Sequence, residues 1–187
     1  MRVLLARHGQ TEWNVLGRRQ GQLDSPLTAA GLAQAHRHAK TLTGFDLDAI
    51  FTSPLGRAST TAAIIAEAVG LPVTVVDELA EVHHGDFTGL TNADIALRHP
   101  NAARERAKDK YNWRFPNGES YADADFRAAK ALALIAQQSR KPLIVSHEMI
   151  GRMLLRNLLA EEPAEALRRN QPHDVIYIVD GGRLTST

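Results

Sequence analysis

Short apolar runs alternate with longer alanine-rich stretches along this chain, and this alternation limits the fold more than any other feature. Apolar runs that are too short for a helix are typical of strands buried on both faces of a sheet. The five runs cover residues 3–6, 49–52, 73–76, 143–146 and 175–179. Strands that alternate with long helices predict a three-layer α/β/α sandwich, with a mainly parallel central sheet and helices on both faces.

The stretches between the runs carry signals for the start and the end of helices. Thr28 and Ser120 are placed as N-caps, and Asp123 lies three residues after Ser120, which is close to a capping box. Gly44 and Gly70 stand where two of the helices should end. The expected helices cover residues 28–42, 55–69, 120–137, 149–159 and 163–169.

The composition restricts the class of protein. The chain has 187 residues, of which 44% are hydrophobic and 23% charged, and this suits one globular domain over residues 1–187. A formal net charge of +1 gives no general attraction to nucleic acid or to an acidic membrane, so neither is expected as a partner. The absence of cysteine excludes thiolate nucleophiles and suits a cytoplasmic location. No apolar run is long enough for a signal or membrane-spanning segment.

Three of the apolar runs are followed by residues that can bind or attack a phosphate. Arg7 and His8 follow the first run, Arg57 comes after the second, and His147 follows the fourth. In an open α/β sheet, ligands bind at the carboxyl ends of the strands, where loops from distant segments meet. Helices should begin just after these residues, so their free backbone N–H groups are expected to face the same space. The sequence therefore predicts an anion site at this edge of the sheet.

The residue types at this edge fit phosphoryl transfer. The guanidinium groups of Arg7 and Arg57 can bind phosphate oxygens in pairs and remain charged. A neutral imidazole, such as that of His8, can act as nucleophile and divide hydrolysis into the formation and the breakdown of a phosphohistidine. Gly9 would let the backbone pass close to the bound phosphate. Glu81, which follows the third run, is placed to protonate the leaving oxygen.

Six sequence blocks, in the same order, resemble those of the histidine phosphatase superfamily, the phosphoglycerate-mutase-like fold, over nearly the whole chain. They cover residues 7–14 (Arg-His-Gly-Gln-Thr-Glu-Trp-Asn), 20–28, 52–58, 81–90, 116–120 and 145–147. The resemblance implies that His8 is the phosphorylated nucleophile and that Glu81 is the acid and base. It also implies that Arg7, Arg57 and His147 bind the phosphoryl group. It implies no metal ion and no cofactor.

Four further residues are expected at the substrate site. By the resemblance, Asn14 and Gln20 contribute polar contacts, and Gly21 belongs to the same block as Gln20. Glu148 stands directly after the second histidine, where the family usually has a glycine. A carboxylate at this position would repel a phosphate unless the side chain turned outward. The departure therefore bears on phosphate affinity.

The function predicted from these residues is a metal-independent phosphomonoesterase that acts on a small phosphorylated metabolite. One alternative is a phosphoglycerate mutase, which returns the phosphoryl group to its substrate. Such mutases are typically longer, and they carry an arginine where this chain has Val82 and a tyrosine where it has His84. The other alternative is a phosphate-binding regulatory module without turnover, which would need neither a nucleophile nor an acid.

Several features remain open at the level of sequence. The physiological substrate is not specified, and apolar helix faces also allow a homo-oligomer. Residues 99–120 predict either a lid over the site or a surface excursion. We interpret His36 and His38 as surface residues of the first long helix. His83 and His84 are adjacent on an extended segment and should point to opposite faces, so they cannot easily share a metal ion.

Overall fold

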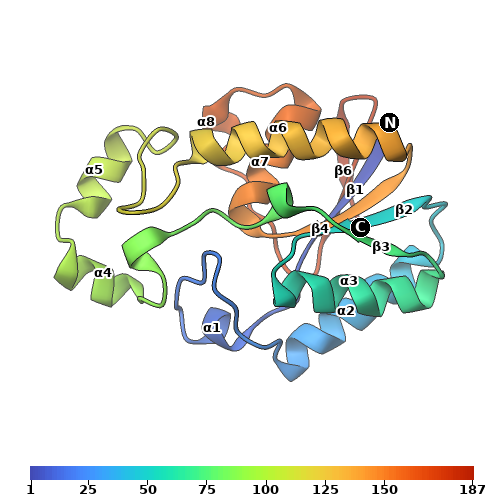
Figure 1. Ribbon diagram of the computed structural model, residues 1–187, viewed down its shortest axis with the longest axis horizontal. Coiled ribbons are helices and arrows are strands. Elements are labelled where there is room, and N and C mark those ends of the chain that lie inside the picture. The colour runs from blue at the N-terminus through green and yellow to red at the C-terminus, as the bar shows by residue number, and fades with distance from the viewer.

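All six strands of the computed structural model, which describes residues 1–187, lie in one sheet (Figure 1). The strand order is β3-β2-β4-β1-β5-β6. The strands are β1 (Arg2–Arg7), β2 (Ala49–Thr52), β3 (Val73–Val75), β4 (Pro142–Ser146), β5 (Ile176–Asp180) and β6 (Arg183–Ser186). The first four are parallel to one another, whereas β5 and β6 run antiparallel. The mainly parallel sheet expected from the sequence is confirmed.

Helices cover both faces of this sheet (Figure 1), so the three-layer architecture is also confirmed. On one face lie α2 (Ala29–Leu42) and α3 (Gly56–Val69), and on the other α6 (Tyr121–Gln138) and α7 (Glu148–Leu159). The shorter helices are α1 (Glu12–Val15), α4 (Asn92–Arg98), α5 (Ala102–Lys108) and α8 (Pro163–Ala166), with 3-10 turns η1 (Asp77–Leu79) and η2 (Gly85–Phe87). No helix combines the length and the apolar character that crossing a bilayer requires.

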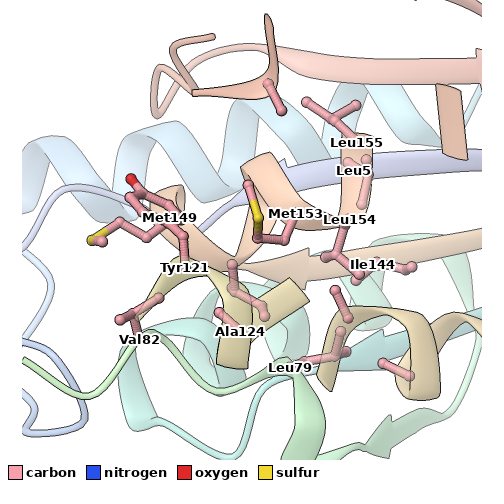
Figure 2. Packing of buried hydrophobic residues seen from close by; sticks show 14 of the residues in the cluster. Leu5, Leu79, Val82, Tyr121, Ala124, Ile144, Met149, Met153, Leu154 and Leu155 are labelled. Atoms are coloured by element: carbon pink, nitrogen blue, oxygen red, sulfur yellow. The ribbon is translucent and has the colours of Figure 1, made fainter. Parts of the chain in front are cut away.

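Each face of the sheet packs into its own core, which explains why the central strands β1, β2 and β4 carry apolar residues at successive positions. Leu5 and Ile144 contribute to a cluster of 24 buried residues under α6 and α7, where Met153 and Leu154 pack against them (Figure 2). Leu4, between Val3 and Leu5 in sequence, instead joins a cluster of 12 buried residues under α2 and α3. Successive strand side chains point to opposite faces, so a strand between two helix layers needs apolar residues throughout.

The predicted helix signals act as expected at their ends. The Thr28 hydroxyl accepts a hydrogen bond from Gly31 N at 3.0 Å and caps α2. Ser120 and Asp123 form a reciprocal capping box at the start of α6. Gly70 adopts a φ of 72° and ends α3. These caps fix where the helices begin relative to the strand ends.

Some expectations from the sequence differ from the structure. The last helix ends at Ala166 rather than at residue 169, and β6 was not predicted. Residues 99–120 contain α5, whose seven residues are too few to give a clear helical period. His38 is buried rather than on the surface, because it faces the sheet and its Nε2 lies 2.9 Å from the carbonyl oxygen of His173. His36 is exposed, as expected.

Candidate active site

A cavity of about 300 Å³ opens at the carboxyl ends of the parallel strands. It is lined by eight of the nine residues expected at the site: Arg7, His8, Asn14, Gln20, Gly21, Arg57, Glu81 and Glu148. The ninth, His147, is fully buried next to His8, with 5.1 Å between the two ring centroids. The structure thus brings together residues from five separate segments of the chain.

His8 is a buried side chain at the end of β1. Its Nδ1 lies 2.7 Å from the carbonyl oxygen of Gly9, and a carbonyl can only accept, so the proton is on Nδ1. This leaves the lone pair of Nε2 free. Burial, together with the positive charges of Arg57 and Arg7, lowers the pKa of His8 well below its ordinary value. His8 is therefore neutral at physiological pH, which is the form that a nucleophile needs.

Arg57 is buried at the start of α3 and is held by four hydrogen bonds. Its guanidinium group donates to the carbonyl oxygens of Leu23 at 2.7 Å and Gly21 at 2.8 Å, and to Asp24 Oδ1 at 2.9 Å. The backbone N–H of Arg57 also donates to Asp24 Oδ1, at 3.2 Å. Its Nε is buried and has no acceptor among the protein atoms. The side chain is therefore fixed with two N–H groups left over, that of Nε and the second one of Nη2.

His147 lies between β4 and α7 with both of its ring nitrogens buried. Its Nε2 is 2.7 Å from Ser53 Oγ, which also accepts from Leu55 N at 3.2 Å. The Ser53 hydroxyl can donate its hydrogen to Nε2, which leaves the ring proton on Nδ1. That nitrogen has no partner among the protein atoms. Burial, with Arg57 and His8 nearby, lowers the pKa of His147 well below its ordinary value.

Glu81 lies in the segment after η1 and caps the first turn of α7. Its Oε1 accepts from Val82 N and Ile150 N, both at 2.9 Å, and its Oε2 accepts from Met149 N at 3.1 Å. The side chain is buried and lines the cavity. The carboxyl group is thus oriented by the backbone rather than by another side chain.

Four of the N–H groups at the helix starts are not free for an anion, contrary to the expectation from the sequence. At α7, Met149 N and Ile150 N donate to Glu81. At α3, Gly56 N and Arg57 N donate to Asp24. Unpaired N–H groups at a buried helix start need acceptors, and here carboxylates of the protein supply them.

The sequence matches the family model of the histidine phosphatase superfamily (branch 1) over residues 3–183. The chain belongs to this superfamily. A probable phosphoglycerate mutase GpmB from Serratia proteamaculans is 37% identical to it over 171 residues, which are 90% of this chain and 79% of the relative. The similarity to a curated relative thus spans most of both proteins.

Two solved structures share the fold of this chain along its whole length. A mycobacterial glucosyl-3-phosphoglycerate phosphatase, in complex with VO3, has a TM-score of 0.89 and 31% identity, with 100% of this chain and 96% of that chain covered. A putative alpha-ribazole-5'-P phosphatase from Escherichia coli has a TM-score of 0.88 and 26% identity, with coverage of 100% and 94%. The relatives therefore include phosphatases as well as a probable mutase.

Glu148, the residue of this chain that departs from the family pattern, is paired with two arginines rather than turned outward. It lines the cavity, and its Oε2 lies 3.0 Å from Arg7 while Oε1 lies 2.5 Å from Arg152. Arg7 also donates to the carbonyl oxygen of Gln171 at 3.0 Å, and its Nε is buried without an acceptor. The carboxylate of Glu148 thus competes for Arg7 with any anion that binds beside His8.

The remaining predicted residues shape the cavity wall. Asn14 Oδ1 accepts from the backbone N–H and the hydroxyl of Thr11, both at 3.0 Å, which caps α1 and leaves the amide nitrogen for the cavity. Gln20 is buried and its Oε1 accepts from Ser25 Oγ at 3.3 Å. Gly21 has a φ of 52°, which favours glycine, and its carbonyl oxygen accepts from Arg57.

The close packing of α2 requires a glycine at position 9, which the sequence alone did not indicate. A Cβ atom at this position would lie 2.4 Å from the carbonyl oxygen of Gly31 on α2. A Cβ at Gly31 would in turn lie 2.0 Å from the carbonyl oxygen of Gln10. The pair of glycines therefore allows α2 to pack directly on the backbone next to His8.

The side chains of the adjacent residues His83 and His84 lie in different environments, as expected. His84 is buried and lines the cavity, whereas His83 is half-buried and its Nδ1 accepts from Gly85 N at 3.1 Å. No three His, Asp or Glu side chains come close enough together to hold a metal ion.

His173 and five basic residues that line the cavity were not predicted from the sequence. His173 Nδ1 lies 2.6 Å from the carbonyl oxygen of His8, and the two rings are 5.3 Å apart. The missed basic residues that line the cavity are Arg18, Arg19, Arg106, Lys110 and Arg152. An antiparallel direction for β5 would have indicated His173, because the start of such a strand lies where the parallel strands end.

Proposed function

We propose that this chain is a phosphatase that hydrolyses small phosphomonoesters through a phosphohistidine on His8, without a metal ion. One observation carries the proposal: a neutral imidazole with a free lone pair lies among buried N–H donors that have no acceptor in the protein. These donors belong to Arg7, Arg57 and His147. Phosphoryl oxygens are acceptors that suit such a set, because charged and polar donors offset the negative charge that they carry.

In the first step, His8 Nε2 attacks the phosphorus atom and the bond from phosphorus to the ester oxygen breaks. The leaving oxygen takes a proton from Glu81. Oε1 of Glu81 already accepts two backbone hydrogen bonds at 2.9 Å, so it suits the carbonyl oxygen of the acid form. Oε2 has one longer hydrogen bond of 3.1 Å, and we assign the transferable proton to it.

In the second step, a water molecule attacks the phosphohistidine. The Glu81 carboxylate removes a proton from this water, and the bond between phosphorus and Nε2 breaks. Inorganic phosphate leaves, His8 is again neutral and Glu81 is again protonated. Throughout, Arg7, Arg57 and Nδ1 of His147 would stabilise the charge on the phosphoryl oxygens.

A phosphoglycerate mutase is the second candidate, because the 37% identical relative is named as a probable mutase. Val82 in place of the arginine of such mutases favours water as the acceptor. The two reactions differ in the fate of the phosphoryl group. Exchange between 2- and 3-phosphoglycerate that is faster than phosphate release would favour the mutase.

The test is phosphate release from p-nitrophenyl phosphate and from glycerol 3-phosphate in excess EDTA. We expect turnover by the natural chain and at least a ~10⁴-fold loss in His8→Ala, as for the removal of other nucleophiles. A brief reaction with a ³²P-labelled substrate should leave a label that is lost in acid and stable in alkali, as a phosphohistidine is. His36→Ala is the matched control, because His36 is exposed on α2. Label that persists in His8→Ala, or turnover that stops in EDTA, would contradict the proposal.

A further inference from the structure

Glu81, the residue assigned to proton transfer, lies in a segment without regular secondary structure. Residues 80–84, between η1 and η2, belong to no helix and no strand. The backbone groups of such a segment have no hydrogen-bond ladder of their own, so other parts of the protein must bind them where they are buried. A general acid also needs a fixed position, because a displacement of about 1 Å can lower the rate about 10²-fold. The partners of this segment therefore matter for the chemistry.

One arginine of α6 binds three carbonyl oxygens of this segment. Arg127 Nη1 donates to the carbonyl oxygens of Glu78 at 2.7 Å and Ala80 at 3.0 Å. Its Nη2 lies 3.4 Å from the carbonyl oxygen of Glu81, which also accepts from Gln22 Nε2 at 3.0 Å. The guanidinium group thus holds the backbone directly before the Glu81 side chain.

Glu119 binds the same segment on the other side of Glu81. Its Oε2 accepts from His83 N at 2.8 Å, and its own backbone N–H donates to the carbonyl oxygen of His83 at 2.9 Å. The Glu119 carboxylate also accepts two hydrogen bonds from Arg127, of 2.8 Å each, as a bidentate pair. We call Arg127 and Glu119 the clamp pair, because together they contact the backbone on both sides of Glu81.

The geometry of the clamp pair is well defined. Both side chains are only 20% exposed, so this is not a surface ion pair that water can replace at little cost. The segments around it are also in direct backbone contact. A Cβ atom at Gly118 would lie 2.3 Å from the carbonyl oxygen of His83, and one at Gly85 would lie 1.8 Å from that of Pro116. The two glycines therefore let the residues before α6 pack tightly on those after Glu81.

The carboxyl group of Glu81 depends on the position of its own backbone. It accepts hydrogen bonds only from backbone N–H groups, those of Val82, Met149 and Ile150. Two of these groups belong to the first turn of α7, so the carboxyl group spans the distance between its segment and that helix. The clamp pair joins the segment to α6, and α6 packs against α7. Both ends of the interaction are thus held relative to one helix.

We propose that Arg127 and Glu119 are positioning residues for proton transfer, because they fix the backbone of residues 78–83 so that the Glu81 carboxyl group lies against α7 and faces the leaving oxygen. The proposal rests on the proposed function, which assigns the proton to Glu81. An ion pair with a purely structural role would affect all substrates alike. A positioning pair affects most strongly those substrates whose leaving oxygen needs a proton.

Two substrates with different leaving groups test the proposal. Glycerol 3-phosphate releases an alkoxide, which must gain a proton as the bond breaks, whereas p-nitrophenyl phosphate releases a stable phenolate. Arg127→Lys should lower kcat/KM at least about tenfold for glycerol 3-phosphate and less than about threefold for p-nitrophenyl phosphate. Lysine keeps the charge beside Glu119 but lacks the planar fork that binds the carboxylate and the carbonyl groups together. The ratio kcat/KM is used because it does not depend on the breakdown of the phosphohistidine.

Arg156→Lys is the matched control. Arg156 pairs with Asp125 of α6 at 2.8 Å, with side chains 27% and 10% exposed, and has no hydrogen bond to residues 78–83. This variant should change the ratio of the two kcat/KM values less than about twofold. Glu119→Gln keeps an amide oxygen for His83 N, so it should change the ratio less than Glu119→Ala does. Equal losses for both substrates in Arg127→Lys would overturn the proposal, as would the same selective loss in Arg156→Lys.

Hydrogen exchange separates this proposal from the proposed function, since it needs no turnover. The amide protons of Met149 and Ile150 are bound by the Glu81 carboxylate and should exchange at least about fivefold faster in Arg127→Lys, whereas that of Leu155 in the middle of α7 should not change. NMR measures these rates. This result supports the clamp pair even if the natural chain hydrolyses nothing. Turnover by the natural chain, with exchange and substrate ratio both unchanged in Arg127→Lys, would leave the phosphatase standing and sink the clamp pair.

Discussion

Two groups of cations line one cavity, and the protein holds them in different ways. The inner group pairs with carboxylates and consists of Arg7, Arg57 and Arg152. The outer group has no carboxylate oxygen within 4.0 Å and consists of Arg18, Arg19, Arg106 and Lys110. Arg57, in the inner group, is buried and donates to two backbone carbonyl oxygens and to Asp24. Arg106, in the outer group, lies on a seven-residue helix away from the sheet and has no carboxylate partner. The inner group is thus fixed by the strand ends and their loops, whereas the outer group depends on a surface segment. Chemistry and substrate preference should therefore respond separately to mutation.

The largest expected effect comes from the inner group. Arg57→Ala should lower kcat for glycerol 3-phosphate by about 10²- to 10³-fold, because a preorganised donor to the phosphoryl group is removed. Arg106→Ala should change this kcat less than about threefold, since Arg106 lies on α5, away from the strand ends that hold the phosphoryl group. Steady-state kinetics on the two variants checks the contrast. Similar losses of kcat in both variants would show that the two groups of cations do not have separate roles.

The inner side of the cavity should also make the stability of the protein depend on pH. Burial, with the charges of Arg19 and Arg57, lowers the pKa of His84 from 6.5 to about 3. The unfolded chain therefore binds a proton more tightly than the folded chain between these values, and stability falls as the pH drops below 6.5. We expect His84 to account for ~1–2 kcal/mol of the decrease in the free energy of unfolding between pH 6.5 and pH 5.

Urea denaturation at pH 6.5 and pH 5 measures this dependence. His84→Gln should have a smaller difference between the two pH values than the natural chain. Arg106→Gln should keep most of the difference, because it leaves the buried imidazole in place. An unchanged difference in His84→Gln would show that this histidine titrates normally in the folded state.

Asp24 should act as a positioning residue for the inner group. It accepts from the guanidinium group of Arg57 and from Gly56 N and Arg57 N. Asp24→Asn should lower kcat about tenfold, because a slightly displaced Arg57 stabilises the transition state less well. Asp24→Glu should recover part of the activity. If KM rises and kcat stays constant, the residue affects substrate binding alone.

The smallest effect is expected at Glu148, which pairs with Arg7 and Arg152 of the inner group. Glu148→Gly, the usual residue of the family, removes the carboxylate that shares Arg7 and Arg152. Inorganic phosphate should then inhibit several-fold more strongly, by about threefold to tenfold, because Arg7 is free for it. The inhibition constant for phosphate gives the answer. Weaker inhibition would mean that Glu148 serves mainly to hold Arg7 in position.

Arg7 and Arg57 of the inner group could be predicted from the sequence, whereas Arg152 and the outer group could not. Arg7, His8 and His147 follow recognisable buried strands, and the rule on strand ends places such residues at one edge. Arg106 and Lys110 lie in or just after a short charged helix, and no periodic pattern tells which way a short helix packs. Long basic side chains on such a segment look the same whether they face solvent or a cavity.

The helix starts gave a different kind of error. The sequence indicated correctly where α3 and α7 begin, but it assigned their free N–H groups to the substrate. Asp24 and Glu81 are distant in sequence from the helices that they cap, by more than thirty and more than sixty residues. Such pairings depend on how the loops fold back, which local patterns do not contain.

Glu81 serves two roles, because the carboxyl group assigned to proton transfer is also the cap of α7. In Glu81→Ala, the N–H groups of Met149 and Ile150 would be left buried without an acceptor, which costs about 1–3 kcal/mol for each group. A loss of activity in Glu81→Ala would therefore not show whether the missing proton donor or the destabilised start of α7 is the cause. Glu81→Gln removes the acid and keeps an amide oxygen as acceptor for Val82 N and Ile150 N, so that only Met149 N loses its acceptor. Glutamine is therefore the substitution that comes nearer to isolating the chemical role.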